Sequence, residues 1–160
     1  MVKIATGKGF ELELPESYDD MKKEAETAIA QILEDKPKAL KLWNLMREDA
    51  EVNADWDMSN YIAVTKLHYN DHGEIHMKIV AMNALKMLKL LDESGIIGAM
   101  VKAKAEDIDD EYLVVLAGGL LHDIGNQVHR ENHNLHGVFL AIPVLDRLLP
   151  EIYEDPELMY

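Results

Sequence analysis

The sequence predicts an all-α protein, a helical bundle with a small β-hairpin at its N-terminus. Apolar residues recur at helical spacing along most of the chain, and the stretch Tyr112–Leu121 is apolar on every side. With 160 residues, 48% of them hydrophobic, the chain can fill one sizeable core. We therefore expect residues 1–57 to form the hairpin and a helical extension, and residues 58–160 to form the helical core that carries the functional site. Together they should make one compact domain.

The N-terminal segment begins with two short runs that alternate apolar and polar side chains. These runs, residues 2–6 and 10–14, lie on either side of Gly7-Lys-Gly9, which is typical of a hairpin. Ser17 or Asp19 can then cap a first helix. The apolar face of this helix consists of residues at helical spacing: Met21, Ala25, Ala28, Ile29, Ile32 and Leu33.

Two further helices are expected before residue 70. Pro37 suits the first turn of the second helix, whose apolar face carries Leu40, Trp43 and Met46. The acidic segment Glu48–Asp57 is interpreted as a connection. A third helix is predicted from Ser59 to about Leu67.

The next helix begins near a pair of histidines. Asp71, followed three residues later by Glu74, has the spacing of a capping box, and the helix should run to about Leu91. Its core face should include Ile75, Ile79, Met82 and Leu85. His72 and His76 are four residues apart, so both should project from the first turns on a common side.

The apolar stretch Tyr112–Leu121 predicts a helix buried at the centre of the domain, and acids among residues 106–111 suit its N-terminus as capping groups. Gly118 and Gly119 cost roughly 1 kcal/mol each relative to alanine, so another element should approach their backbone closely. Gly125 is predicted to be the C-cap.

His122 and Asp123 would then lie in the last turn of the buried helix. An ionised carboxylate there faces the negative end of the helix dipole, which is unfavourable unless a cation offsets it. A metal ion is the simplest such cation. The chain continues with a polar, histidine-rich segment, residues 126–137, and then a helix over residues 138–149 that Pro143 should kink or interrupt.

Composition limits the partners. The 30 acidic and 16 basic residues leave a net charge of −14, which argues against binding to a nucleic acid polymer or an anionic membrane. The chain has no cysteine, no signal peptide and no apolar run of transmembrane length, so we expect a cytoplasmic protein. A small phosphorylated substrate remains compatible with this charge if a metal screens it, and a homo-oligomer stays open.

All seven histidines fall between His68 and His136. Imidazole together with carboxylate suits Mn, Fe, Co, Ni or Zn, and suits Mg only where few imidazoles bind. The alternative for any single histidine is a helix cap or a hydrogen bond to a backbone carbonyl, and we assign His68 and His136 to that alternative. An adjacent His122-Asp123 pair that ends a wholly apolar helix is harder to explain by one ordinary cap.

These residues resemble the HD superfamily of metal-dependent phosphohydrolases, whose pattern is a histidine, a later His-Asp doublet and a final aspartate. His76, His122 and Asp123 match the first three positions. The strings Asn70-Asp-His-Gly-Glu-Ile-His76 and His122-Asp-Ile-Gly-Asn126 are similar to a branch of predicted metal-binding HD proteins in archaea and bacteria. The resemblance implies an all-helical HD core in which His76, His122 and Asp123 bind one ion, with Asp123 placed to bridge a second.

The departure from the family pattern is its final aspartate. In a straight helix Asp146 would lie 13 positions beyond His133, about 20 Å along the axis and on nearly the opposite face, so the two could not share a metal. We therefore expect His133 to be the additional ligand, with His129 as the second choice.

The leading hypothesis is a metal-dependent phosphohydrolase acting on a nucleotide-like small molecule, as a phosphomonoesterase or a phosphodiesterase. Asp123 is expected to orient the attacking water, and His72, Arg130 and Asn126 to bind the substrate. For Arg130 an ion pair with Glu131 or another acid is the alternative. Two other classes remain open: a di-iron oxygenase-type HD enzyme, and a non-catalytic HD module that binds metal or nucleotide and regulates a partner.

Overall fold

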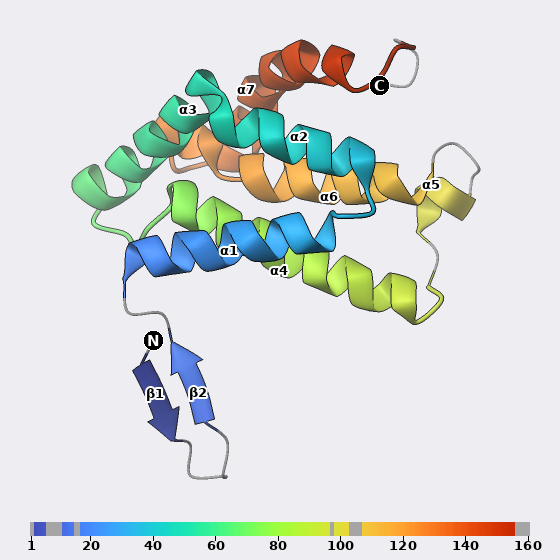
Figure 1. Ribbon diagram of the computed structural model, residues 1–160. Coiled ribbons are helices and arrows are strands. Elements are labelled where there is room, and N and C mark those ends of the chain that lie inside the picture. The colour runs from blue at the N-terminus through green and yellow to red at the C-terminus, as the bar shows by residue number, and fades with distance from the viewer. Residues whose placement is uncertain (1, 6–10, 15–16, 97, 103–106, 156–160) are drawn as a thin grey trace.

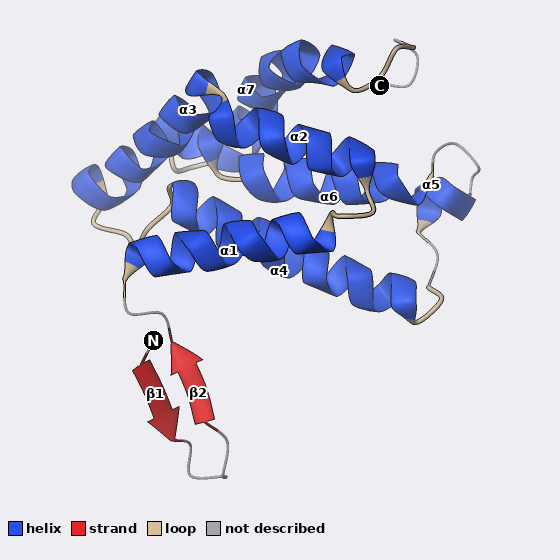
Figure 2. Ribbon diagram, in the orientation of Figure 1, coloured by secondary structure: helices blue, strands red, loops and turns tan. Residues whose placement is uncertain are grey.

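The computed structural model describes residues 2–5, 11–14, 17–96, 98–102 and 107–155, and confirms the all-α fold (Figures 1 and 2). The longer helices of the bundle are α1 (Tyr18–Ile32), α2 (Pro37–Glu48), α3 (Ala50–Asn60), α4 (Glu74–Glu93), α6 (Ile108–Leu121) and α7 (His133–Leu148). The shorter elements are a π-helix (Tyr61–Lys66), α5 (Ala99–Lys102) and two 3₁₀ turns (Ile124–Gln127 and Leu149–Glu151). No helix in the described part of the chain is both long and apolar enough to cross a membrane.

The N-terminal hairpin consists of β1 (Val2–Ala5) and β2 (Glu11–Leu14), which pair antiparallel with Val2 opposite Leu14. The predicted Gly7-Lys-Gly9 turn lies outside the described residues. Figure 1 shows the two strands apart from the helices.

The first two helices begin where the sequence predicts. The Ser17 hydroxyl caps α1 by accepting a hydrogen bond from the Asp20 amide at 3.2 Å, and Pro37 occupies the first turn of α2. The first turn of α2 is held by an acid of another helix: Asp109 accepts hydrogen bonds from the amides of Lys38 and Ala39 at 2.7 and 3.0 Å. The start of α6 is thereby joined to the start of α2.

The interpretation of Glu48–Asp57 as a connection is wrong, because α3 begins within it. Asp49 is the N-cap of α3, and its carboxylate accepts hydrogen bonds from the amides of Glu51 and Val52. Val52, Trp56 and Ser59 are buried at helical spacing, whereas the acids of this segment lie mainly on its exposed side. The many acidic residues of this segment obscure its short buried face in the sequence pattern. The helix then passes directly into the π-helix Tyr61–Lys66.

Helix α4 starts at Glu74, as expected, but without a capping box. Its N-cap is Gly73, and Glu74 forms ion pairs with Lys22 and Lys78 at 2.7 and 2.5 Å instead of returning to the backbone. Asp71 nevertheless supports the first turn, because its carboxylate accepts a hydrogen bond from the His76 amide at 3.1 Å.

Helices α4 and α6 lie side by side at the centre of the bundle, with α1 packed on α4 and α2 packed on α6. Asp107 and Asp110 form a capping box at the start of α6, which confirms the capping role expected of these acids. Gly119 allows the close approach of α4: a Cβ atom on it would lie 2.6 Å from the Ala81 Cα. A Cβ atom on Gly118 would meet nothing within 4 Å, so the predicted close approach of another element to Gly118 is wrong.

Pro143 was expected to kink or interrupt this helix; α7 is continuous through Pro143, so it does not interrupt it. Pro143 is exposed, while Val144 and Leu148 beyond it are buried in the core. Packing on this buried side keeps the helix together across the missing backbone hydrogen bond.

Candidate metal centre

The end of α6 carries His122 and Asp123 into the interior of the bundle. The helix stops at Leu121, His122 is its C-cap, and Asp123 (φ −111°, ψ 0°) starts the 3₁₀ turn Ile124–Gln127. Two side chains of α3 hold the carbonyl groups of this segment: the Trp56 indole donates to Leu120 O at 2.8 Å, and the Ser59 hydroxyl donates to Ile124 O at 3.1 Å. The position of Asp123 therefore depends on α3 as well as on its own helix.

The prediction that Gly125 is the C-cap of this helix is wrong, because Gly125 lies inside the 3₁₀ turn. The absence of a side chain at Gly125 allows α7 to pack closely against this turn. A Cβ atom on Gly125 would lie 1.9 Å from the His133 carbonyl oxygen, so glycine lets the first turn of α7 approach the turn that follows Asp123.

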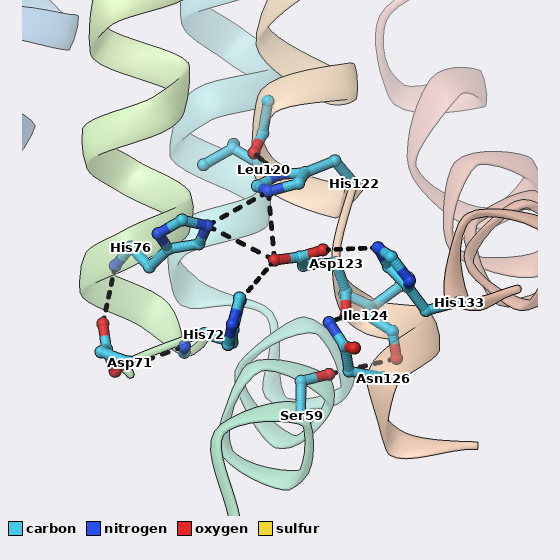
Figure 3. A network of polar contacts seen from close by, with 12 residues as sticks. Ser59, Asp71, His72, His76, Leu120, His122, Asp123, Ile124, Asn126 and His133 are labelled. Carbon is cyan, nitrogen blue, oxygen red and sulfur yellow. Dashed lines mark hydrogen bonds and ion pairs between the residues drawn. The ribbon is translucent and has the colours of Figure 1, made fainter. Parts of the chain in front are cut away.

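The segment around the start of α4 supplies two more histidines, His72 just before the helix and His76 in its first turn. The His72 amide donates to the Asn60 side-chain oxygen at 3.1 Å, and the His76 amide donates to Asp71 at 3.1 Å. These two backbone contacts direct both imidazole rings toward Asp123 (Figure 3). The rings pack edge to face, with centroids 5.1 Å apart.

Four imidazoles surround the Asp123 carboxylate (Figure 3). Its Oδ2 lies 2.7 Å from His72 Nδ1, 3.4 Å from His76 Nε2 and 3.3 Å from His122 Nε2. Its Oδ1 lies 3.2 Å from His133 Nε2. Asp123 is only 4% exposed, so its two oxygens face histidine nitrogens on different sides with little access to water.

Backbone carbonyls determine the tautomers of two of these histidines. His122 Nδ1 donates to Gly119 O at 2.9 Å, and His133 Nδ1 donates to Arg130 O at 3.0 Å. In the neutral form of each ring, Nε2 therefore has no hydrogen and directs a lone pair outward. This is the arrangement that backbone acceptors impose on metal-binding histidines.

Lone pairs directed at a carboxylate repel it unless a cation lies between them. His133 Nε2 faces Asp123 Oδ1 in this way, and the Nε2 atoms of His122 and His76 lie 3.3 Å apart. Either protons on the imidazoles or a bound metal ion would remove the repulsion. Imidazole and carboxylate are together the donor set of a first-row transition ion, so the residues present fit such a group.

The electrostatics of Asp123 agree with this reading. Burial raises the pKa of its carboxyl, but hydrogen bonds from His122, His76 and His72 outweigh burial and hold the pKa far below its ordinary value. The hydrogen bond to Asp123 in turn raises the pKa of His122, against the opposing effect of burial. Asp123 therefore stays ionised and attracts positive charge into the interior.

His72, His76 and Asp123 have donor atoms within 4.8 Å of one another. From the sequence we assigned His72 to substrate binding, whereas its ring lies against Asp123 at only 9% exposure. In the sequence, the four-residue spacing between His72 and His76 was the signal that His72 could also be a ligand. Sequence reasoning also missed Asn60, whose side chain positions the His72 backbone.

The structure does not bring His129 to the cluster. It is exposed on the loop before α7, and its Nδ1 accepts a hydrogen bond from the Glu131 amide at 3.0 Å. His133, the first choice for an additional ligand, does lie against Asp123. Asp146 lies near the other end of the continuous helix α7.

Asn126 and Arg130 form a support beneath the site. Asn126 is fully buried; its Nδ2 donates to Asp123 O at 3.0 Å, and its Oδ1 accepts from Arg130 at 2.9 Å. Both ends of this amide are in use, so Asn126 holds the loop instead of facing a substrate. The Arg130 guanidinium also lies over the Tyr69 ring, 5.5 Å from its centroid, and pairs with no acid among the residues that the structure describes.

Comparisons with known proteins relate the chain to an archaeal protein. No family model matches the chain, and no solved structure matches it. The chain is 42% identical over 114 residues to the uncharacterized protein MJ1020 of Methanocaldococcus jannaschii. The match covers 71% of this chain and 44% of the relative, so the chain spans less than half of the relative's length. The name of the relative states no activity.

Proposed function

We propose that this protein is a metal-dependent phosphohydrolase of the HD type, which cleaves a phosphoester or phosphoanhydride bond of a small nucleotide-like molecule. The observation that carries the proposal is the surrounding of Asp123: three imidazoles face its Oδ2 and a fourth faces its Oδ1. The resemblance of His76, His122 and Asp123 to the HD pattern supports the same assignment. We further propose a cytoplasmic location, where small phosphorylated metabolites are made.

Two groups of donors would hold metal. His72, His76 and His122 share Oδ2 of Asp123 and would bind the first ion, while His133 and Oδ1 would contribute to a second. The number of imidazoles favours Mn, Fe, Co, Ni or Zn over Mg. A divalent ion bound there would lower the pKa of a water molecule and draw charge from a phosphoryl oxygen.

The protein's own residues supply orientation and charge. Asp123, kept ionised by its histidines, can accept a hydrogen bond from the attacking water and so orient it. Arg130 is held in place by Asn126 and Tyr69 and has no acidic partner among the described residues, so its remaining donors can bind phosphate oxygens. In a chain of net charge −14 this local positive charge is what an anionic substrate requires.

A cleft of about 560 Å³ is lined by Asn70 and Asp71, the residues that precede His72, and would take the other part of the substrate. It is lined by Tyr18, Asp57, Asn60, Val64, Tyr69, Asn70, Asp71, Glu74 and Ile75. The carboxylates of Asp57 and Asp71 would repel a phosphate. We therefore expect the cleft to receive the uncharged or amine-bearing part, with the phosphate toward Arg130.

A second candidate function is oxidation of a substrate by two iron ions bound by the same histidines and Asp123. It is favoured by one observation, that the two oxygens of Asp123 face different histidines and could each bind a separate ion. Visible absorption or Mössbauer signals from protein produced with iron would identify this chemistry. Their absence, together with hydrolysis supported by other metals, would exclude it.

The decisive experiment begins with metal analysis of protein purified without chelator or metal-affinity resin. Nucleotides, cyclic dinucleotides and simple phosphoesters are then tested with Mn, Co, Ni and Mg. We expect turnover by the wild type, its loss in His122→Ala, and its retention in the matched variant His136→Ala on α7. Metal-loaded, folded protein that turns over no substrate would contradict the proposal. Tight nucleotide binding without product would support the regulatory alternative.

A further inference from the structure

One face of α3 contacts both sides of the candidate metal centre. Trp56, Ser59 and Asn60 are separated by three and four residues from the first to the others, which places their side chains on one face of the helix. Trp56 and Ser59 are fully buried and donate to carbonyl oxygens on either side of His122-Asp123. Figure 3 shows the Ser59 hydroxyl directed toward the turn that follows this doublet. The doublet is therefore held by α3 at both of its ends.

Asn60, the last residue of α3, holds the opposite side of the site. Its side-chain oxygen accepts a hydrogen bond from the His72 amide at 3.1 Å. The loop comes close to α3 at this point because Gly73 has no side chain: a Cβ atom on Gly73 would lie 2.8 Å from the Asn60 Cβ. Within the part of the chain that the structure describes, Asn60 Nδ2 makes no hydrogen bond. The oxygen is thus the atom of this amide that acts on the loop.

The two held segments meet at the shortest contact of the Asp123 carboxylate with a histidine. His72 Nδ1 lies 2.7 Å from Asp123 Oδ2, whereas the nitrogens of the other three histidines lie 3.2–3.4 Å from the carboxylate. His72 is 9% and Asp123 is 4% exposed, so water has little access to this contact. An ionised carboxylate only accepts hydrogen bonds, so His72 Nδ1 carries the hydrogen. The length of the contact depends on where α3 holds the two backbones.

We propose that Ser59 and Asn60 are positioning residues of the metal centre, which fix Asp123 and His72 relative to each other before an ion binds. This inference rests on the proposed function, because it takes His72 and Asp123 as metal ligands. Ser59 and Asn60 are not ligands themselves. Each holds backbone at or next to a ligand, and because the two are neighbours in one helix, their separation is constant. Outer contacts that orient ligands typically change metal affinity about 10–100-fold.

Two replacements of Asn60 separate its hydrogen bond from its packing. Asn60→Asp keeps an acceptor oxygen at the same position, and the Nδ2 group that it loses makes no hydrogen bond with the described residues. Asn60→Leu has a similar volume and no acceptor. The His72 amide should therefore keep its partner in the first variant and lose it in the second.

Asn53 supplies a matched control on the same helix. Its Nδ2 donates to the carbonyl oxygens of Arg47 and Asp49 at 3.2 and 2.7 Å. Asn53→Ala therefore also removes hydrogen bonds between an α3 side chain and backbone, but none of them reaches the metal centre. Any loss of metal caused only by a weaker α3 should appear in this variant as well.

Metal affinity gives the first readout, measured by competition of Zn or Co with a chromogenic chelator. Asn60→Leu should bind the ion at least about tenfold more weakly than the wild type, and Asn60→Asp within about threefold of it. Asn53→Ala should stay within about twofold. The visible absorption bands of bound Co should change in Asn60→Leu, because the ligand geometry changes, and should be unaltered in Asn53→Ala.

Combining two variants tests whether Ser59 and Asn60 act on the same contact. Ser59→Ala removes the hydrogen bond to Ile124 O and should also weaken metal binding about tenfold. Ser59→Ala combined with Asn60→Leu should lose much less than the product of the two effects, about a hundredfold, because a contact already lost cannot be lost again.

The metal-free protein gives a readout that does not depend on the proposed function. Spectra correlating ¹H and ¹⁵N in the imidazole rings, recorded at mildly alkaline pH where the rings are neutral, identify the nitrogen that carries the hydrogen. His72 should carry it on Nδ1 in the wild type, Asn60→Asp and Asn53→Ala. In Asn60→Leu this preference should disappear, because the ring is no longer held against Asp123. The same pattern in a wild type that binds no metal would refute the metal centre and still support the positioning of His72.

A folded Asn60→Leu with the affinity, Co spectrum and His72 tautomer of the wild type would overturn the inference. So would an Asn60→Asp that loses metal as fully as Asn60→Leu, since the acceptor oxygen would then not be the active group. Equal weakening in Asn53→Ala would assign the effect to the stability of α3. Losses that multiply in the Ser59 and Asn60 combination would refute their joint action.

Discussion

Gly125 lies directly against His133: a Cβ atom on Gly125 would be 1.9 Å from the His133 carbonyl oxygen and 2.4 Å from the Gly137 nitrogen. The turn after Asp123 and the first turn of α7 are therefore in contact through backbone atoms. This contact sets the distance of 3.2 Å between His133 Nε2 and Asp123 Oδ1. A glycine that is itself no ligand thus contributes to the geometry of the candidate metal centre through the backbone of His133.

Gly125→Ala should accordingly lower the free energy of unfolding by about 1–3 kcal/mol or more, because backbone cannot yield as a flexible side chain can. Urea unfolding would measure the loss. The matched control is Gly118→Ala, where nothing lies within 4 Å of the added Cβ. That variant should gain up to about 1 kcal/mol from its better helix propensity. Equal effects of the two substitutions would show that the contact of Gly125 with α7 is not close in solution.

Asn126→Ala should also destabilise the protein. The side chain is fully buried and connects the Asp123 carbonyl to the Arg130 guanidinium. Its removal takes the hydrogen-bond acceptor from the Arg130 guanidinium, while the Asp123 carbonyl keeps the hydrogen bond from the Asn126 backbone amide at 3.0 Å. The loss should cost about 1–3 kcal/mol in thermal or urea unfolding. Asn134→Ala, at an exposed position of α7, should stay within about 0.5 kcal/mol of the wild type. Unchanged stability of Asn126→Ala would mean that the amide is solvated, and would return it to the substrate-binding role predicted from the sequence.

Asp49 should contribute stability that depends on pH. Its hydrogen bonds with Arg147 of α7 lower the pKa of the carboxyl below the ordinary 3.8, although burial acts in the opposite direction. A carboxyl with a depressed folded-state pKa stabilises the protein above its unfolded-state pKa, and the contribution disappears as the pH falls through the folded-state value.

The test compares urea unfolding of the wild type and Asp49→Asn between neutral pH and pH 3. Asparagine still caps α3, so only the charge is removed. Arg147 is 42% exposed, and the difference at neutral pH should be only about 0.5–1 kcal/mol. This difference in the free energy of unfolding should shrink below pH 3.8. A difference that persists unchanged in acid would assign the effect to the cap instead of the ion pair.

The helical fold could be predicted because most helices carry their own signals. Ser17, Pro37 and Asp107 mark helix starts that the structure confirms. Helix α3 was missed because its buried residues, Val52, Trp56 and Ser59, are interrupted by acids and polar residues. Burial of a short face by neighbouring helices outweighed a weak local pattern.

The candidate site could be predicted only in part. His122-Asp123 and His76 stand out because polar residues at the ends of apolar helices need an explanation. The place of His72 depends on Asn60, which is 12 residues earlier on α3, and no local pattern indicates that contact. The separation of His129 from His133 depends likewise on the backbone of the loop, where the Arg130 carbonyl orients one ring and the Glu131 amide holds the other.

Asp146→Asn should leave metal binding unchanged if the centre is formed as proposed. Helix α7 is continuous from His133 to Leu148, so Asp146 lies about 20 Å along the axis from His133. Isothermal titration with Mn, Co or Zn should give the wild-type affinity. Loss of the metal from a protein with unchanged circular dichroism would show that α7 folds back at Pro143 in solution.

The last prediction distinguishes the ligand set indicated by the structure from the one predicted by sequence. The sequence placed His129 among the candidate ligands and His72 at the substrate, whereas His72 Nδ1 lies 2.7 Å from Asp123 Oδ2 and His129 is exposed. His72→Ala should therefore weaken metal binding at least about tenfold, because it removes a buried imidazole from the donor group. His129→Ala should change the affinity by less than about twofold, since its ring contacts only the loop backbone. Competition titration against a chromogenic chelator measures both. If His129→Ala loses the metal and His72→Ala keeps it, the loop before α7 must close over the site when metal binds, and His72 is left for the substrate.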